Sequence, residues 1–346
     1  MISRKPLLPE PAAREQKPAP ADLPPAITRQ LEKLVKAKIT GVVFAEGGLS
    51  VSAAFIFTLD DGRRVFAKGA HPGDTAHGVK NLAQEVLVYE CVDVVRRVSP
   101  PYIGLVSDGE EQGWMLGVWE CVEHDPGRAT VHRAVASLAS WQRTAPAQAL
   151  LPAAKQHVYI SQLLSAERKW LRLRNDDIAR KKFFHMFARP EAGKAWFDAN
   201  IAKLCQHQAR CGQLKTEEGL LHGDLRVDNF LFGPEKTYVI DWPNACWGPL
   251  VFDPVFLSSN LEALGFGPAE LFFTQYAGAA KPISPEDQAP VLGALSGYFA
   301  DQAYRDNVEK MPRLRWMQKS MLLAQLRYMA RLGLIESLPQ MAGENQ

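Results

Sequence analysis

The sequence predicts an α+β protein of two lobes, an N-terminal lobe built on an antiparallel sheet and a largely helical C-terminal lobe. Short β-prone runs bounded by turn residues recur between about residues 41 and 119. From about residue 125, apolar residues instead recur at helical spacing over long stretches. The chain has 346 residues, 47% of them hydrophobic, which is enough to bury a sizeable core.

The N-terminal lobe is expected to begin with a short helix from about Pro25 to Lys38, followed by a strand over 41–45. The glycine-rich stretch EGGLS at 46–50 leads to a longer strand. Asp61-Gly62 is a strong hairpin signal, and it precedes the strand residues VFAK at 65–68. Strands joined by such a tight turn pair antiparallel, so these runs predict the sheet.

One helix and two further strands complete this lobe. Apolar residues at positions 79, 82, 83, 86 and 89 predict a helix from about His77 to Arg97, which Pro100 and Pro101 end. The two strands are expected at 103–106 and 114–119.

Residues 1–25 are rich in proline, alanine and charge, and we expect a flexible leader there. No apolar stretch follows the basic residues at the start, and no apolar run is long enough for a bilayer, so we expect a cytoplasmic protein without a membrane partner. A net charge of +2 without a basic and aromatic cluster argues against nucleic acid as a partner.

The cysteines indicate reduced thiols. There are five, an odd number, and none forms a CxxC pair, which is typical of cytosolic proteins. Cys205, His207 and Cys211 lie at offsets that do not share one face of a helix, so packing is favoured over a zinc site.

The octapeptide HGDLRVDN at 222–229 concentrates polar groups between two apolar runs. Burying such groups without partners is costly, so they are solvated, paired or bound to a ligand. A loop held by its own hydrogen bonds is the simplest alternative. The next residues predict a hairpin, in which pairing of Phe232 near Thr237 returns Asn229 close to Asp241. This coupling favours a functional site over a merely structural loop.

Asp224, Asn229 and Asp241 thus meet in one small volume. Carboxylate and amide oxygens suit Mg²⁺, whose remaining ligands are commonly substrate phosphates. Lys68 offers a fixed positive charge for phosphate oxygens, and either Glu85 or, less favoured, Glu90 is placed to hold it. We interpret His222 and Asp253 as structural, the latter capping a helix or fixing loop amides.

These motifs resemble the aminoglycoside phosphotransferase family, small-molecule kinases of the protein-kinase-like fold. The resemblance rests on HGDLRVDN, on VIDW at 239–242 with Gly248 and Asp253, and on EGGLS followed by VFAK. It covers about residues 40–335 and is weakest between about 125 and 215. It divides the chain into a nucleotide-binding lobe at 26–118, a hinge at 119–124 and a catalytic and substrate-binding lobe at 125–340.

The resemblance also implies the role of each residue. Asp224 is the catalytic base, Asn229 and Asp241 hold Mg²⁺, and Lys68 with Glu85 orients the phosphates of ATP. The nucleotide contacts further include the loop serines and the linker, namely Ser50, Ser52, Trp119, Glu120 and Cys121. Arg226 stands where protein kinases usually carry a lysine, and we hypothesise that it neutralises charge on the transferred group.

The predicted function is therefore ATP-dependent phosphorylation of a hydroxyl on a small molecule. The alternatives are a protein kinase, for which the eleven residues between Asp241 and Asp253 leave little room, and a nucleotide-binding regulator without turnover, which would need no base. The acceptor, the choice of ATP or GTP, and a monomeric or homodimeric state stay open. A basic run at 168–182 weakly favours an acceptor less cationic than an aminoglycoside, although such runs are usually solvated helix faces.

Overall fold

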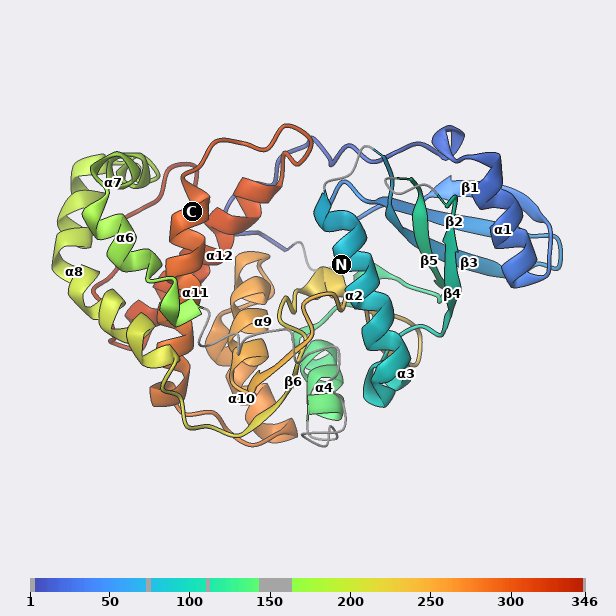
Figure 1. Ribbon diagram of the computed structural model, residues 1–346. Coiled ribbons are helices and arrows are strands. Elements are labelled where there is room, and N and C mark those ends of the chain that lie inside the picture. The colour runs from blue at the N-terminus through green and yellow to red at the C-terminus, as the bar shows by residue number, and fades with distance from the viewer. Residues whose placement is uncertain (1–3, 73–75, 110–112, 143–163, 345–346) are drawn as a thin grey trace.

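The computed structural model describes residues 4–72, 76–109, 113–142 and 164–344. A sheet with its covering helices forms one end of the molecule, and a group of helices forms the other (Figure 1). The α+β fold with an antiparallel N-terminal sheet, predicted from the sequence, is confirmed.

The N-terminal sheet has five antiparallel strands in the order β1-β2-β3-β5-β4. Its strands are β1 (Ile39–Phe44), β2 (Ala53–Leu59), β3 (Arg64–Ala70), β4 (Tyr102–Ser107) and β5 (Met115–Glu120). Alternate residues of β2 and β3, such as Phe55 and Ala67, are fully buried, because they face helix α1 (Pro25–Val35). The opposite face of β3 carries Lys68.

Two of the predicted helices differ from the sequence pattern, since one is shorter and the other is divided. α1 ends at Val35 because Lys36 takes a left-handed conformation, with φ of 55°, and closes the helix. The helix expected from His77 to Arg97 is two helices, α2 (Ala76–Cys91) and α3 (Asp93–Val98). The break is at Val92, which has extended backbone and is buried, so its packing overrides the helical pattern.

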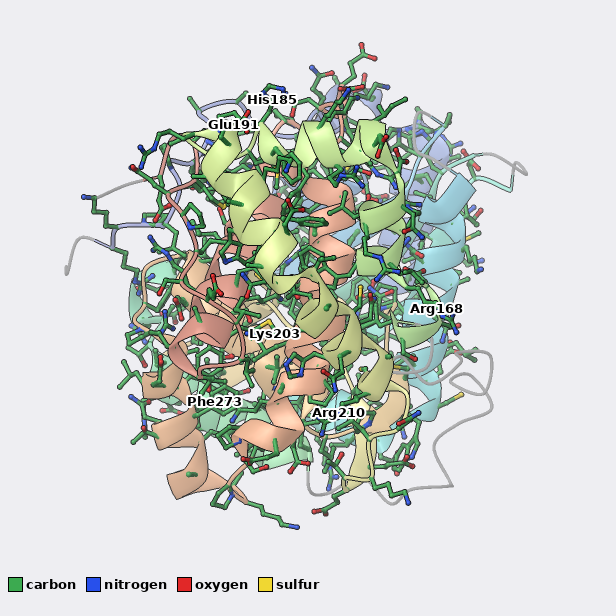
Figure 2. All side chains as sticks on the ribbon, turned by 90° about the vertical axis from the view of Figure 1, so that its left-hand side faces the viewer. Arg168, His185, Glu191, Lys203, Arg210 and Phe273 are labelled. Carbon is green, nitrogen blue, oxygen red and sulfur yellow. The ribbon has the colours of Figure 1, made fainter. Side chains whose placement is uncertain are left out.

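The C-terminal lobe is mainly helical. Among the described residues, its helices are α4 (Val131–Gln142), α6 (Lys169–Asn175), α7 (Asp177–Phe184), α8 (Pro190–Cys211), α9 (Phe252–Ala263), α10 (Ala269–Ala279), α11 (Pro285–Ala303) and α12 (Leu314–Arg331). Helix α8, which carries Glu191, Lys203 and Arg210, lies at the outer end of the lobe (Figure 2). α11 packs between α8 and α12 and is buried over most of its length. The amphipathic stretch expected at 314–332 is α12, whose Met321, Leu326 and Met329 lie in the core.

The C-terminal lobe also contains two small two-stranded antiparallel sheets. β6 (Glu218–Leu221) pairs with β9 (Cys246–Pro249), and β7 (Phe230–Phe232) pairs with β8 (Thr237–Val239). They carry the segments on either side of HGDLRVDN. Among the described residues, no helix is both long enough and apolar enough to cross a membrane.

Residues 4–24, for which the sequence predicts a flexible leader, contact both lobes of the structure. Leu8 is buried, and its carbonyl accepts a hydrogen bond from the indole of Trp316 at 3.1 Å. Glu15 is also buried, against Arg313. Single anchoring residues in a proline-rich segment leave no periodic pattern, which is why the sequence did not reveal these contacts.

Candidate functional site

The hairpin predicted after HGDLRVDN is present in the expected register, with Phe232 opposite Thr237. Beyond the last paired residues, the Ile240 nitrogen donates to the Asn229 carbonyl at 2.9 Å. Asp241 follows directly and has a left-handed backbone, with φ of 70°. This conformation is uncommon for a residue other than glycine, and the hairpin holds it in place.

The loop before the hairpin is fixed by helix α9. The carboxylate of Asp253 accepts hydrogen bonds from the backbone nitrogens of His222 and Gly223, at 2.7 and 3.1 Å. The side chain of Asn260 accepts another from Val227 nitrogen at 2.8 Å. Gly223 has a φ of 81°, and a β-carbon there would lie 2.5 Å from the carbonyl oxygen of Asn244. The structure therefore requires glycine at this position.

His222 ties the two segments together. Its ring is fully buried, with Nε2 bonded to the Ile240 carbonyl at 2.9 Å, while Asp224 nitrogen donates to Nδ1 at 3.3 Å. Burial lowers the pKa of His222 to about 4, so the ring is neutral at physiological pH. These contacts agree with the structural role expected from the sequence.

Asp224 lies in a partly open position, with its side chain 27% exposed. Arg226 approaches it, with Nη1 3.5 Å from Oδ2, and also contacts Asp228 through Nε at 3.0 Å. Burial raises the pKa of Asp224 to about 6, although the charge of Arg226 opposes the rise. A carboxylate with such a pKa can accept a proton near neutral pH.

Asn229 and Asp241 each carry a side-chain oxygen of the kind that binds a hard cation. The Asn229 amide donates from Nδ2 to the Asp224 carbonyl at 2.8 Å, so its Oδ1 is turned to the other side. Asp241 meets Lys68 through Oδ1. Burial alone would raise the pKa of Asp241, but the positive charge of Lys68 outweighs it and lowers that pKa to about 2. An amide oxygen and an ionised carboxylate fit Mg²⁺.

Lys68 connects the sheet to this hairpin. Its Nζ lies 3.0 Å from Oε2 of Glu85, which projects from α2 and is buried, and it also contacts Asp241. Burial acts to lower the pKa of Lys68, but the two carboxylates outweigh it and raise the pKa. Of the two candidates that the sequence left open, the structure pairs Glu85 with Lys68, while Glu90 is exposed.

The glycine-rich stretch has the conformation that only glycine readily adopts. Gly47 and Gly48 have φ values of 104° and 69°. Beyond them, Ser50 is exposed and Ser52 is half-buried. The stretch joins β1 to β2, at the end of the sheet where β3 carries Lys68 opposite Ala54.

The predicted linker makes packing contacts and backbone hydrogen bonds with neighbouring segments. Trp119 is buried against Tyr89 and Tyr102, at ring-centroid distances of 5.5 Å each. Glu120 and Cys121 donate their backbone N–H groups to the carbonyls of Pro101 and Arg64, at 2.9 and 3.2 Å. Since these two N–H groups already have backbone partners, recognition of a purine base by the linker backbone would use the remaining N–H and carbonyl groups.

The sequence analysis missed an apolar row on the Lys68 face of the sheet. Val43, Ile56 and Phe66 are paired across β1, β2 and β3, two residues along from the row of Ala54 and Lys68. Val43 is 55% exposed, and Ile56 and Phe66 are half-buried. Ile56 and Phe66 lie two residues from Ala54 and Lys68 in the sequence. Because alternate residues of a strand share a face, this spacing could have predicted the row.

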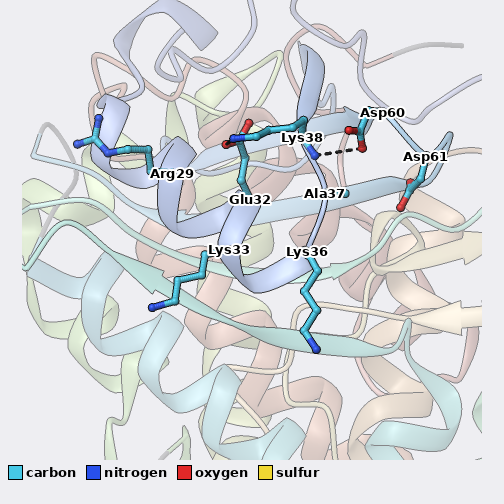
Figure 3. Close-up of a pocket in the computed structure, with 8 residues that line it drawn as sticks. All are labelled: Arg29, Glu32, Lys33, Lys36, Ala37, Lys38, Asp60 and Asp61. Atoms are coloured by element: carbon cyan, nitrogen blue, oxygen red, sulfur yellow. Dashed lines mark hydrogen bonds and ion pairs between the residues drawn. The ribbon is translucent and has the colours of Figure 1, made fainter.

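A separate surface pocket of about 540 Å³ lies beside α1 (Figure 3). Its lining residues come from α1, the turn after it and the β2–β3 turn, namely Arg29, Glu32, Lys33, Lys36, Ala37, Lys38, Asp60 and Asp61. The Lys38 ammonium group pairs with Glu32 at 2.8 Å, and the Lys38 backbone nitrogen donates to the Asp60 carboxylate at 3.1 Å. None of the predicted site residues lines this pocket, so it is distinct from the candidate site.

Comparison with known proteins identifies one matching family. Residues 42–285 match the pattern of the phosphotransferase enzyme family. No match was found among curated proteins.

Solved structures resemble the whole fold. A spectinomycin phosphotransferase in complex with ADP and spectinomycin aligns with a TM-score of 0.55 and 15% identity, covering 86% of this chain and 94% of the other. A GDP complex of an aminoglycoside 2′-phosphotransferase mutant aligns with a TM-score of 0.59 and 16% identity, covering 88% of this chain and 96% of the other. The choline kinase LicA from Streptococcus pneumoniae aligns with a TM-score of 0.53 and 15% identity, covering 85% of this chain and 97% of the other. At these identities the likeness shows the fold, which is the kinase-like fold of these enzymes.

Proposed function

The chain belongs to the phosphotransferase enzyme family, and on that premise we propose that it transfers the γ-phosphoryl group of ATP to a hydroxyl of a small molecule. One observation carries the proposal. The Asn229 amide is bonded to the Asp224 backbone, and Lys68 joins Asp241 to Glu85. A base, two oxygen ligands and a phosphate-binding cation would thereby be assembled from three different segments of the chain.

In this proposal the nucleotide lies between the sheet and the hairpin. The apolar row of Val43, Ile56 and Phe66 offers a surface for a planar base. Lys68, oriented by Glu85, holds phosphate oxygens, and Ser50 and Ser52 line the glycine-rich loop above them. The solved relatives with ADP or GDP support a nucleotide site in this fold, and ATP is the donor that the resemblance implies.

Asn229 and Asp241 would hold Mg²⁺, which supplies charge neutralisation for the phosphates when it is bound. Asp224 orients the acceptor hydroxyl by hydrogen bonding and accepts its proton late, because phosphoryl transfer passes through a loose transition state. Arg226 lies beside Asp224, where a planar guanidinium can offset negative charge on the transferred group. Most of the catalysis in this scheme comes from positioning.

A protein substrate is disfavoured by the segment after Asp241. Protein kinases dock a peptide on a long segment here, whereas in this chain β9 occupies 246–249 and α9 begins at Phe252. β9 is also committed to pairing with β6. The remaining residues are too few to form a peptide-docking surface.

The acceptor is left to experiment. The basic run that argued against a polycationic acceptor is partly neutralised, since Lys169 and Arg172 pair with the buried Asp301 and Arg180 pairs with Asp177. The solved relatives include phosphotransferases crystallised with spectinomycin or named for choline. A preference for a less cationic hydroxyl compound is therefore only weakly supported.

The test is a turnover assay with ATP and GTP over a panel of aminoglycosides, amino alcohols, sugars and nucleosides, with phosphorylated products detected by mass spectrometry. We expect a product with at least one acceptor, and roughly 10²–10⁴-fold slower formation of that product by Asp224→Asn. Tight binding of Mg-ATP without product from any member would instead favour a nucleotide-binding regulator.

A further inference from the structure

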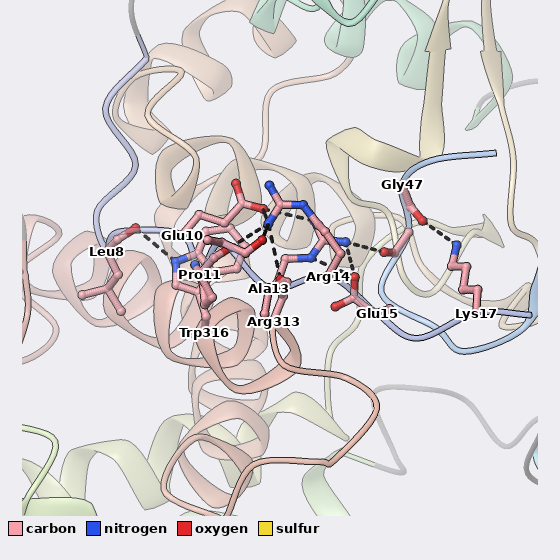
Figure 4. A network of polar contacts seen from close by, with 12 residues as sticks. Leu8, Glu10, Pro11, Ala13, Arg14, Glu15, Lys17, Gly47, Arg313 and Trp316 are labelled. Atoms are coloured by element: carbon pink, nitrogen blue, oxygen red, sulfur yellow. Dashed lines mark hydrogen bonds and ion pairs between the residues drawn. The ribbon is translucent and has the colours of Figure 1, made fainter. Parts of the chain in front are cut away.

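The N-terminal leader reaches the glycine-rich loop and supplies it with a positive charge. Nζ of Lys17 donates to the Gly47 carbonyl at 2.6 Å, and a β-carbon on Gly48 would lie 3.6 Å from the same Nζ (Figure 4). Lys17 lies 30 residues before Gly47 in the chain, so this contact is tertiary rather than local. The leader precedes the region matched by the family pattern, which begins at residue 42.

The position of Lys17 is fixed by an ion-pair cluster next to it (Figure 4). Arg313, immediately before α12, donates from Nε to Glu15 at 2.8 Å and from Nη1 to Glu10 at 3.1 Å. The same guanidinium donates to the Gly48 carbonyl at 2.7 Å. The side chain of Glu15 is only 2% exposed and that of Arg313 13%, so this cluster is largely removed from solvent. It anchors the leader to both lobes at the tip of the loop.

Further contacts hold the leader on the C-terminal lobe. Leu7 nitrogen donates to the Ala263 carbonyl at 3.0 Å, and Gln16 nitrogen donates to the Lys310 carbonyl at 3.1 Å. Because Glu15 and Gln16 directly precede Lys17, the backbone on the N-terminal side of the lysine is held. A lysine delivered by a fixed backbone loses less freedom on binding an anion than a lysine on a free terminus.

The electrostatic surroundings of Lys17 are those of the candidate phosphate site. Burial and then the charge of Lys68 lower the pKa of Lys17, whereas Glu15 and Asp241 act to raise it. Lys17 is therefore within electrostatic range of both members of the Lys68–Asp241 pair. It also lines a surface cavity of about 360 Å³ together with His71 and Lys310.

We propose that Lys17 is a further nucleotide-binding residue, a cation that the leader contributes to the phosphates of a nucleotide held under the glycine-rich loop. The inference rests on the proposed function, because it needs a nucleotide in that cleft. An ammonium group has three donors, so Lys17 can keep its bond to Gly47 and still donate to a phosphate oxygen. Arg313 with Glu15 and Glu10 acts as the positioning group for the segment.

The test measures binding of ADP and of adenosine by calorimetry to the full chain with Lys17→Gln, Lys17→Arg or Arg14→Gln. Arg14 is the matched control, since it is a leader cation whose side chain is 59% exposed and contacts only the leader itself. We expect Lys17→Gln to weaken ADP binding about tenfold, as loss of a charged hydrogen bond does, with adenosine affinity unchanged. Lys17→Arg and Arg14→Gln should remain within about twofold of the unmodified chain.

Equal affinity of Lys17→Gln and the unmodified chain for ADP would overturn the proposal. An equal loss for ADP and adenosine would also overturn it, because that pattern assigns Lys17 a structural role in shaping the cleft. Failure of the unmodified chain to bind ADP or ATP at all would contradict the proposed function itself. The two failures are thus distinguishable.

Discussion

Ile240 donates its backbone N–H to the carbonyl of Asn229 at 2.9 Å, which locks the two ends of the hairpin together. Asn229 and the residue after Ile240, Asp241, are the proposed metal ligands. Since the β7–β8 register continues into this bond, a slip of one residue would turn one of them away from the other. The proposed metal site is thus set by the same pairing that forms the hairpin.

Replacing Asp224 with asparagine should abolish most turnover while leaving nucleotide binding nearly unchanged. The substitution keeps the shape of the side chain but removes its ability to accept a proton, and a positioned general base contributes roughly 10²–10⁴-fold to rate. The measurement is kcat with the best acceptor of the panel, next to the affinity for ADP. Turnover within a fewfold of the unmodified enzyme would exclude Asp224 as the base.

The pH dependence should reflect the raised pKa of Asp224. Because the reactive form is the carboxylate, kcat/KM should level off above about pH 7, reach half of its plateau near the pKa of about 6, and fall further as the pH drops. Arg226 acts to lower that pKa, so Arg226→Gln should move the acidic limb to higher pH. A limb that stays in place would disprove this coupling. Full turnover by Arg226→Ala would make Arg226 a structural residue.

Glu85→Gln should lower kcat/KM roughly tenfold or more, because a neutral amide no longer holds the Lys68 ammonium for the phosphates. Glu90→Gln on the same helix is the control, since Glu90 is exposed and should tolerate the change. Steady-state kinetics with varied ATP test this pair. If Glu85→Gln and Glu90→Gln lowered kcat/KM equally, the ion pair between Glu85 and Lys68 would have no specific role in turnover.

Gly223→Ala should destabilise the chain by about 2 kcal/mol or more, because alanine would adopt an unfavourable positive φ and its methyl group would meet Asn244. Gly278, inside α10, has open space around it and ordinary helical backbone. Gly278→Ala should therefore stabilise the chain by about 0.5–1 kcal/mol. Thermal unfolding of both variants gives the comparison. A stable Gly223→Ala variant would mean that the loop can relax around the added carbon.

The parts of the site that the sequence could predict are those encoded by local patterns. The turn signal after Phe232 fixes a hairpin, and the hairpin fixes the proximity of Asn229 and Asp241, so both could be inferred without coordinates. The choice of Glu85 over Glu90 could not be inferred in this way. It depends on how the helix is rotated relative to the strand that carries Lys68, and tertiary packing sets that rotation.

The leader shows the limit of composition as a guide. Its proline and charge content predicts a segment that cannot fold alone, yet Leu8 and Glu15 find partners on the C-terminal lobe. The break at Val92 is similar, because burial of one residue overrode a helical periodicity that otherwise continues. In both cases the deciding contact is made by residues far away in the sequence.

The central claim is that Asn229 and Asp241 share one Mg²⁺ with the bound nucleotide. It is tested most directly by the dependence of ATP affinity on Mg²⁺, measured by calorimetry for the unmodified chain, Asn229→Ala and Asp241→Asn. We expect Mg²⁺ to strengthen ATP binding by the unmodified chain, and each substitution to remove most of this gain. ATP binding that is indifferent to Mg²⁺, or a gain that survives both substitutions, would contradict it.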